Sequence, residues 1–326
     1  MKLQQLRYLV AVADVGLNVT AAAQLLHTSQ PSISKQLRLL EDELGLRLFV
    51  RRSRALVKLT PAGEKVIARA RVILREATNI RGLAAEIRQD EEGALSIATT
   101  HTQARYVLPE VLKRFRQNYP GIRVHLHQGT SDQIAEILKR EQIDFVVATG
   151  VNALFDKLVR LPVFRWRRGI VVPTGHPLTA TPKATFAQLA QYPIITYAFS
   201  FSGPSSLLAQ FADAGVIPSI ALTAWDSDVL KEYVRAGFGV GILADISIKK
   251  DEDGDLRLID ASHLFPPHTT WIGFHRGALL RSYMYEFIQL LAPHLSRRHV
   301  QQAERSESQE SLDKTFADTS VPFRRL

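Results

Sequence analysis

Cysteine is missing from this sequence of 326 residues. Its absence excludes disulfide bonds, thiolate metal sites and a cysteine nucleophile, and it is typical of a protein of the reducing cytoplasm. Long apolar runs are missing too: no stretch reaches the roughly 18 residues that a transmembrane helix needs, so we expect none. The N-terminus lacks a convincing cleavage site, so we expect neither a secretory signal nor a membrane partner.

Acidic residues are the minority among the charged ones, and the formal net charge is +9. A basic excess favours a polyanionic partner, above all nucleic acid. The excess is concentrated near the N-terminus, since residues 1–60 hold nine lysines and arginines against four acidic residues. With 46% hydrophobic and 22% charged residues, the chain has the composition of a globular protein and the length for two or more domains.

The first 45 residues predict three short helices joined by tight turns. In the third, Thr28 or Ser29 can act as N-cap and Pro31 suits the first turn. Its buried stripe is Ile33, Leu37, Leu40 and Leu44. The residues left outward near its N-terminus are donors, acceptors and cations, as a helix in the DNA major groove requires. We therefore predict that this helix contacts DNA through Ser29, Gln30, Pro31, Ser32, Ser34, Lys35 and Arg38.

An arginine-rich hairpin is predicted immediately after this helix, in the run LRLFVRRSRALVKLTPAG. Two short strands flank the turn, which places Arg51, Arg52 and Arg54 where a β wing meets the DNA backbone. Taken alone, such a hairpin is as readily a solvated turn. Because it follows a helix-turn-helix pattern, we predict a winged helix-turn-helix domain over residues 1–60.

Residues 61–90 predict one long helix, with Thr60 as N-cap and Pro61 at its first position. Its apolar residues repeat at alternating spacings of four and three, which is the heptad pattern of paired helices. The alternative is a helix packed on its own domain. We predict a dimerisation seam of Val66, Ala70, Ile73, Ala77, Ile80, Ala84 and Ile87.

Strand-like and helix-like segments alternate from about residue 93 to residue 295, which predicts an α/β domain with largely parallel sheets. The length of this region allows two lobes. Strands are expected at 94–100, 122–128, 143–149, 169–173, 193–199, 220–224, 239–243 and 269–275. Helices are expected at 103–118, 131–140, 205–214, 227–236 and 283–291. The domain spans residues 91–296, and residues 297–326 read as a flexible polar tail.

Hydroxyl side chains gather at the ends of three of these strands, at Thr99-Thr100-His101-Thr102-Gln103, at Thr149 and at Ser200 to Ser202. Ligands of open α/β sheets bind at the carboxyl ends of strands, and helix N-termini stabilise anions. Each residue alone reads as a cap. The three together predict a site for a sulfate-like oxyanion.

The run AAAQLLHTSQPSISKQLRLLEDELGLRLFVRR followed by LTPAG resembles the N-terminal module of LysR-type transcriptional regulators. Within that family, MKLQQLRY, IATTHTQARYVLP, HQGT and LRSYMYEFIQ resemble the CysB-type branch, which controls sulfur assimilation. The resemblance covers roughly residues 1–295. It implies a winged helix-turn-helix, a linker helix and a two-lobed effector domain like that of periplasmic binding proteins.

The resemblance also implies an effector pocket made of Thr100, Thr102, Gln103, Thr149, Trp166 and Ser202. Effectors of the branch are small sulfur-pathway molecules such as sulfate, thiosulfate, acetylserine and adenylyl sulfate. The chain departs from the branch in three places: Pro204 replaces an arginine, Val163 a cysteine and Arg167 an asparagine. These departures leave open a LysR-type regulator of another pathway with a different anionic effector.

Other functions are disfavoured. His125 and His127 lack a third metal ligand at suitable spacing, so no metal site is predicted, and no catalytic set indicates an enzyme. A solute-binding protein would need an export signal, and an architectural DNA-binding protein would not need a ligand domain. We predict a cytoplasmic activator without a cofactor, a homodimer or homotetramer that binds double-stranded promoter operators and contacts RNA polymerase.

Overall fold

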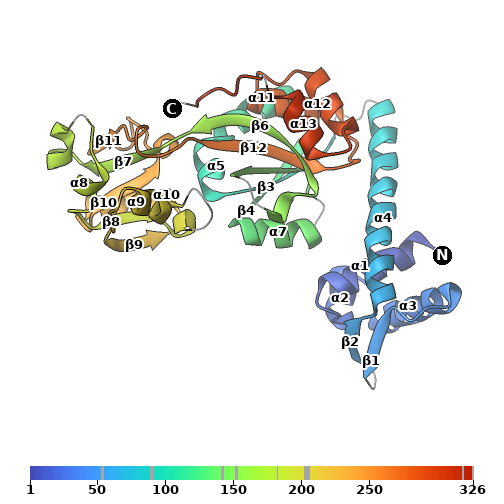
Figure 1. The fold of residues 1–326 in the computed structure, drawn as a ribbon. Coiled ribbons are helices and arrows are strands. Elements are labelled where there is room, and N and C mark those ends of the chain that lie inside the picture. Colours follow the sequence, from blue (N-terminus) through green and yellow to red (C-terminus); the bar gives the residue numbers. More distant parts are fainter. Residues whose placement is uncertain are drawn as a thin grey trace. The chain divides into compact units, whose positions relative to one another are not determined.

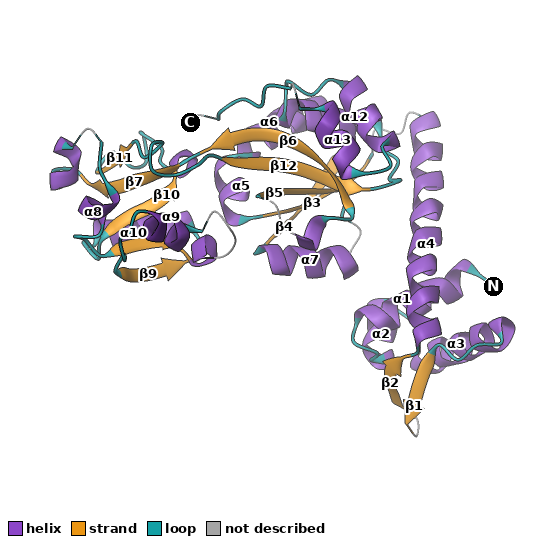
Figure 2. Ribbon diagram, viewed as in Figure 1, coloured by secondary structure: helices purple, strands orange, loops and turns teal. Residues whose placement is uncertain are grey.

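The computed structural model describes residues 1–52, 55–88, 92–140, 143–150, 153–181, 183–201, 206–317 and 319–324. Arg54 and Ser202, which have predicted roles, lie outside the described residues, as does Pro204. The chain divides into two compact units, one built mainly from residues 1–90 and the other from most of residues 91–326. Figures 1 and 2 label the helices and strands of both units.

The N-terminal unit is a winged helix-turn-helix followed by a long helix. Its elements are α1 (Leu3–Asp14), α2 (Val19–Leu25), α3 (Gln30–Leu44), β1 (Phe49–Arg52), β2 (Ala55–Leu59) and α4 (Pro61–Ile87). The predicted stripe of α3 is confirmed, because Ile33, Leu37 and Leu40 are buried and Leu44 packs against the same core. Ser29 caps α3, accepting a hydrogen bond from the Ser32 N–H, and Thr60 caps α4 by accepting one from the Gly63 N–H.

No single helix among the described residues is long and apolar enough to cross a membrane. The bent pair of α1 and α2 passes such a test by length and composition only. Leu6, Leu9, Val12, Ala22 and Ala23 of this pair are buried in the core of the N-terminal unit.

The second unit holds two five-stranded sheets, and we call the part built on the first sheet the first lobe and the part built on the second sheet the second lobe. The first has the order β4-β3-β5-β12-β6, with β3 (Gly93–Thr99), β4 (Ile122–Gln128), β5 (Phe145–Thr149), β6 (Leu158–Trp166) and β12 (His268–His275). The second has the order β11-β7-β10-β8-β9, with β7 (Arg168–Pro173), β8 (Ile194–Tyr197), β9 (Ile220–Ala224), β10 (Val240–Ala244) and β11 (Leu256–Ile259). The chain therefore passes from the first sheet to the second at Arg167 and returns between Ile259 and His268.

Helices and short 3-10 turns connect these strands. The α-helices are α5 (His101–Tyr106), α6 (Leu108–Asn118), α7 (Ser131–Arg140), α8 (Phe186–Leu189), α9 (Leu207–Asp213), α10 (Ser227–Arg235) and α11 (Ser282–Leu291). The 3-10 turns are η1 (Ala153–Phe155), η2 (Pro177–Ala180), η3 (Ala198–Phe201) and η4 (Asp245–Ser247). In the first lobe, Phe115 of α6 and Phe145 of β5 both contact the ring of Phe287 on α11, so an aromatic cluster joins these helices to the sheet.

The expectation of largely parallel sheets is confirmed, because in each sheet only one strand, β12 or β7, runs against the other four. Two other expectations need correction in this unit. The strands β6 and β11 are not predicted. Pro162 inside β6 argues against a strand, yet it is tolerated because β6 lies at the edge of its sheet. The helix expected at 103–118 is broken at Val107, ahead of Pro109, into α5 and α6.

The prediction of a flexible tail over residues 297–326 is wrong for the described part of that segment. It forms α12 (Arg297–Arg305) and α13 (Gln309–Thr315), which are capped by Ser296 and Ser308. Val300, Ala303, Leu312 and Phe316 are buried. Few apolar residues occur in this polar segment, but helical spacing places them on the faces that pack.

Candidate functional site

The N-terminal half of α3 presents the polar surface that the sequence predicts. Gln30, Pro31, Lys35 and Arg38 are exposed, whereas Ser32 and Ser34 are half-buried. The Gln30 side-chain amide donates a hydrogen bond of 3.1 Å to the Ser34 hydroxyl. The Ser29 hydroxyl is occupied as the helix cap. The arrangement offers amide, hydroxyl and cationic groups on one surface, which suits base edges and phosphates.

The wing is anchored to α3 by a buried carboxylate. Oε1 of Glu41 accepts hydrogen bonds from the N–H groups of Leu48 at 2.8 Å and Phe49 at 3.3 Å. Its Oε2 accepts one from Nη2 of Arg51 at 2.7 Å. Arg51 is therefore held by Glu41, while Arg52 beside it is exposed.

The residues of the heptad row on α4 are buried at the start of the helix and exposed further along it. Ala70 is buried in the core of the N-terminal unit and Val66 packs against that core. Further along, Ile73, Ile80 and Ile87 are 37%, 67% and 73% exposed. The row therefore leaves an apolar surface, typical of a helix that pairs with another helix.

In the second unit, a cluster of polar side chains lies where the ends of β5, β6 and β12 meet α5. We call Gln103, Thr149, Trp166 and Thr270 the polar cluster. Nε2 of Gln103 donates to the hydroxyls of Thr149 at 3.2 Å and Thr270 at 3.3 Å, and these two hydroxyls are 2.9 Å apart. The indole N–H of Trp166 donates to Thr149 at 3.4 Å. Three predicted pocket residues, Gln103, Thr149 and Trp166, are thus in contact.

One acceptor of the cluster is unsatisfied. Gln103 is 1% exposed, and its Oε1 is buried without a hydrogen-bond partner. A buried polar atom without a partner costs free energy. Thr100 precedes α5, and its hydroxyl does not cap that helix. Thr102 is buried.

A buried cation and a neutral imidazole stand beside the cluster. Arg168 is 5% exposed, and burial lowers its pKa to about 10, so the guanidinium stays protonated at neutral pH. The ring of His268 stacks on Trp166 with centroids 4.7 Å apart. Burial, with the charge of Arg168, lowers the pKa of His268 to about 4, and its Nε2 is buried without a partner. The site therefore combines neutral donors with one buried positive charge.

Ion pairs join the two lobes. The guanidinium of Arg105 on α5 lies 3.0 Å from both Asp228 and Glu252 of the second lobe, and the Tyr106 hydroxyl also donates to Asp228. Burial alone would raise the pKa of Asp228, but hydrogen bonds from Tyr106, Lys231 and Arg105 outweigh it and lower the pKa to about 2. Asp228 is thus ionised at neutral pH, and these contacts favour the observed arrangement of the lobes.

Three residues of this region, Arg168, His268 and Thr270, are not predicted from the sequence. Thr270 and His268 lie on the antiparallel strand β12, which returns from the second lobe beside Trp166. In the sequence, the adjacent threonines Thr269 and Thr270 at the start of a predicted strand are the one signal that points to His268 and Thr270.

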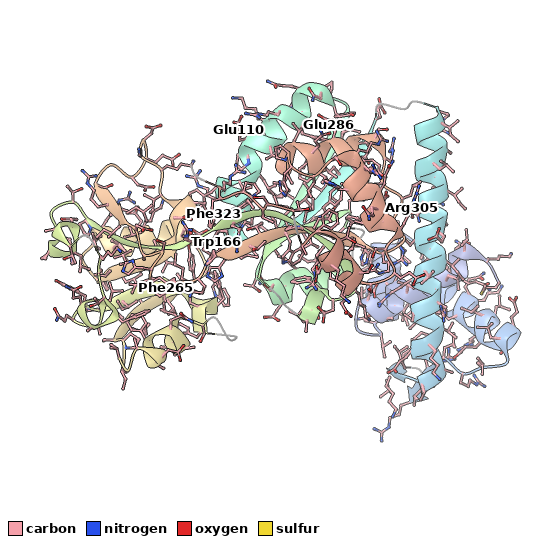
Figure 3. All side chains as sticks on the ribbon, turned by 45° about the horizontal axis from the view of Figure 1, so that its top comes forward. Glu110, Trp166, Phe265, Glu286, Arg305 and Phe323 are labelled. Atoms are coloured by element: carbon pink, nitrogen blue, oxygen red, sulfur yellow. The ribbon has the colours of Figure 1, made fainter. Side chains whose placement is uncertain are left out.

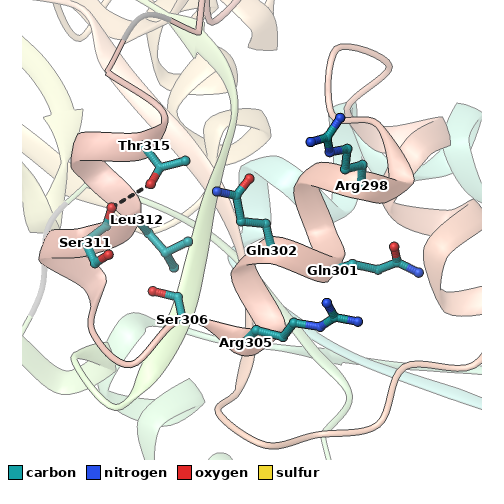
Figure 4. Close-up of a pocket in the computed structure, with 8 residues that line it drawn as sticks. All are labelled: Arg298, Gln301, Gln302, Arg305, Ser306, Ser311, Leu312 and Thr315. Atoms are coloured by element: carbon teal, nitrogen blue, oxygen red, sulfur yellow. Dashed lines mark hydrogen bonds between the residues drawn. The ribbon is translucent and has the colours of Figure 1, made fainter.

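A separate polar cavity of about 450 Å³ opens between α12 and α13 (Figure 4). One face of α12 lines it with Arg298, Gln301, Gln302 and Arg305, and α13 adds Ser311, Leu312 and Thr315. Of the predicted effector residues that the structure describes, none lines this cavity. Among the described residues, no group of three or more histidine, aspartate and glutamate side chains is arranged to hold a metal ion.

Comparison with known proteins agrees with this arrangement. Residues 3–64 match the profile of the bacterial regulatory helix-turn-helix protein, lysR family, and residues 88–296 match the LysR substrate binding domain. The regulator CysB of Haemophilus influenzae is 47% identical over 97% of this chain and 98% of its own length. The regulator cbl of Escherichia coli K12 is 40% identical, over 96% and 99%.

A solved structure is similar to the second unit. The crystal structure of the cofactor-binding domain of the Cbl transcriptional regulator matches with a TM-score of 0.61 and 41% identity. The match covers 67% of this chain and 96% of that one.

Proposed function

The chain belongs to the LysR family of transcriptional regulators, in the branch that controls sulfur assimilation, and on this premise we propose how its two units divide the task. The N-terminal unit reads operator DNA through α3 and the wing. The second unit binds a small sulfur-pathway oxyanion, and that binding sets the activity of the regulator at its promoters.

The observation that carries the DNA-binding part is the division of α3 into two faces. Ile33, Leu37 and Leu40 hold one face in the core, so the face with Gln30, Lys35 and Arg38 has a defined orientation. In this proposal Ser32, Ser34 and Gln30 approach base edges, while Lys35, Arg38 and Arg52 contact phosphates. Arg51 acts by holding the wing. Arg54 keeps its predicted phosphate role and lies outside the described residues.

The effector part rests on the polar cluster. An oxyanion that enters here replaces the mutual hydrogen bonds of Thr149, Thr270 and Gln103 with charge-assisted ones, which are roughly twice as strong. Thr100 and Thr102 contribute further hydroxyls, and Ser202, outside the described residues, completes the predicted set. Sulfate, thiosulfate, acetylserine and adenylyl sulfate are the candidate effectors. A different anionic effector is the alternative, because Val163, Arg167 and Pro204 depart from the branch.

The exposed isoleucines of α4 support a dimer paired through this helix, and effector domains that join dimers would make a tetramer. Two reading helices would then meet half-sites about one turn of DNA, roughly 34 Å, apart. The effector shifts the assembly toward the arrangement that binds the effector with the higher affinity. The bound regulator activates transcription through contact with RNA polymerase, in the cytoplasm.

Salt-dependent DNA binding tests the first part. Lys35→Ala and Arg52→Ala should weaken operator binding, and each should lower the slope of log affinity against log salt by about 1. Lys183→Ala, an exposed lysine of the effector domain, is the matched control. Unchanged slopes in both variants would remove these residues from the DNA interface.

Calorimetric titration of the full chain with sulfate, thiosulfate, N-acetylserine and adenylyl sulfate tests the second part, with phosphate as control. Saturable binding that Thr100→Val abolishes would support the pocket. Binding that survives Thr100→Val, or silence across the panel, would contradict the effector assignment and leave DNA binding untouched.

A further inference from the structure

The last described residues of the chain extend an edge of the first sheet. Within β6, the N–H of Arg165 donates to the carbonyl of Pro322 at 2.8 Å, and its carbonyl accepts from the N–H of Arg324 at 2.9 Å. Residue Phe323 between them forms a parallel bridge with Arg165. Because β6 is an edge strand, these bonds satisfy backbone groups that would otherwise face solvent.

A residue of α13, earlier in the chain, also bonds to the backbone of this edge strand. The side-chain amide of Gln309 on α13 accepts from the N–H of Arg160 at 2.9 Å and donates to its carbonyl at 3.0 Å. The pairing of β6 with β12 skips Val163, so the outward-facing backbone groups change parity between Arg160 and Arg165. The C-terminal segment therefore fits this particular irregular edge at two points.

The ring of Phe323 adds a side-chain contact to the backbone pairing. The guanidinium carbon of Arg167 lies 4.0 Å from the centre of this ring, and that of Arg165 lies 5.5 Å from it. Both distances are within the range of cation–π attraction. Phe323 thus contacts the residue before Trp166 and the residue after it. Figure 3 labels Phe323 and Trp166.

Residues 165–167 connect three parts of the second unit. Trp166 donates to Thr149 of the polar cluster. Arg167 is the first crossing between the lobes: its N–H donates to the Asp245 carboxylate at 3.1 Å, and its carbonyl accepts from the Asp245 N–H at 2.9 Å. Residues 322–324 of the C-terminal segment contact Arg165 and Arg167, which is the third connection. A change at Phe323 therefore reaches the crossing through direct contacts with Arg165 and Arg167, and it reaches Trp166 through the backbone of these two neighbours.

We propose that Phe323 is a positioning residue of the effector site: residues 322–324 hold the lobe crossing at Arg165 and Arg167, and this fixes Trp166 against the polar cluster. The effector part rests on the function proposed above. When the ring is removed, a smaller fraction of molecules holds Trp166 in the binding arrangement, and the apparent effector affinity falls by that fraction.

The first measurement needs no ligand. The chain has three tryptophans, so labelling the full-length protein with 5-fluorotryptophan gives three ¹⁹F resonances, and Trp166→Phe assigns one of them. Phe323→Ala should move or broaden the Trp166 resonance and leave the other two in place. Phe323→Tyr, which keeps the ring, should restore it. Phe238→Ala, an exposed phenylalanine that packs on Tyr233, is the matched control and should change nothing at Trp166.

The second measurement is effector affinity, by titration of sulfate and N-acetylserine into the same proteins. Phe323→Ala should raise Kd about three- to tenfold, Phe323→Tyr should not, and operator affinity should be unchanged. A Trp166 resonance that stays in place while only the melting temperature falls would overturn the proposal and reduce the segment to an edge cover. A shifted resonance in a protein that binds neither compound would support the positioning role and contradict the proposed effector.

Discussion

Glu41 of α3 and Arg51 of β1 form an ion pair with N–O distance 2.7 Å, and the Glu41 side chain is only 2% exposed. The same carboxylate accepts two backbone N–H groups at the start of the wing. The recognition helix and the wing are therefore held together by one buried side chain. Their spacing, which decides whether both can contact one DNA duplex, depends on this pair.

Glu41→Gln should loosen the wing. The amide oxygen can still accept the backbone N–H groups, but the guanidinium of Arg51 loses its charged partner, at a cost of about 1.5–3 kcal/mol. We expect a lower melting temperature and weaker operator binding. Glu43→Gln on the same helix, where the carboxylate is half exposed, is the control and should have little effect. Equal stability of the two variants would show that the buried pair is not needed.

Gly63→Ala should disrupt the junction between the wing and α4. A Cβ at this position would lie 2.1 Å from the carbonyl oxygen of Leu48, so the backbone must move. Thermal unfolding should show a loss of about 2 kcal/mol or more, comparable with overpacking a core. Gly82→Ala in the same helix meets nothing closer than 3.9 Å and should be neutral or stabilising. A stable Gly63→Ala protein would contradict the close approach.

Ile80→Asp should weaken the dimer. Ile80 is 67% exposed, so the change should cost the single chain little, whereas a charge in a helix seam opposes pairing. Analytical ultracentrifugation should show dissociation at concentrations where the unchanged protein is associated. Arg81→Asp, on a neighbouring exposed position outside the heptad row, is the control. Dissociation of both variants alike would point to a charge effect and not to the seam.

Thr149→Val should abolish the response to effector. The substitution keeps the shape of the side chain but removes the hydroxyl shared by Gln103, Trp166 and Thr270. Operator binding without effector should persist, because the DNA-binding unit is unchanged. Fluorescence anisotropy with labelled operator, with and without effector, measures both. Thr130→Val, at the start of α7, is a control hydroxyl outside the cluster, and its effector response should be normal.

Stability of the second unit should decline in mild acid because of His268. Its pKa in the folded chain is about 4, below the ordinary 6.5, so between these values the unfolded chain binds a proton that the folded chain does not. The unfolding free energy should therefore fall as pH drops from about 6.5 to 4, and this contribution is level above 6.5. His268→Phe, which keeps an aromatic ring on Trp166, should flatten the slope in thermal unfolding between pH 7 and 5. A slope unchanged by the substitution would assign the acid sensitivity to other groups.

Local pattern was sufficient for the N-terminal unit. The stripe of Ile33, Leu37 and Leu40, the cap at Ser29 and the cap at Thr60 depend on residues within one or two helical turns. Such interactions are encoded at fixed spacings, so sequence predicts them directly. It also predicts most strands and helices of the second unit, because their apolar periodicity is strong.

The local sequence pattern was insufficient in two places, the edge strand β6 and the C-terminal segment. β6 contains Pro162, which local propensity reads as a break, and only its place at the sheet edge makes the strand possible. The polar segment after residue 296 reads as disordered by composition. A few apolar side chains, Val300, Ala303, Leu312 and Phe316, nevertheless bury enough surface for it to pack.

Short-range periodicity and capping predict the reading helix, the wing, the long heptad helix and the α/β alternation of the second unit, and the family resemblance adds its two lobes. The tertiary structure decided which polar groups meet. Gln103 and Thr270 are 167 residues apart, Thr149 and Thr270 are 121 apart, and Phe323 reaches Arg167 from the far end of the chain. Such contacts depend on strand order and register, and these are set by packing of the whole domain and not by any local spacing.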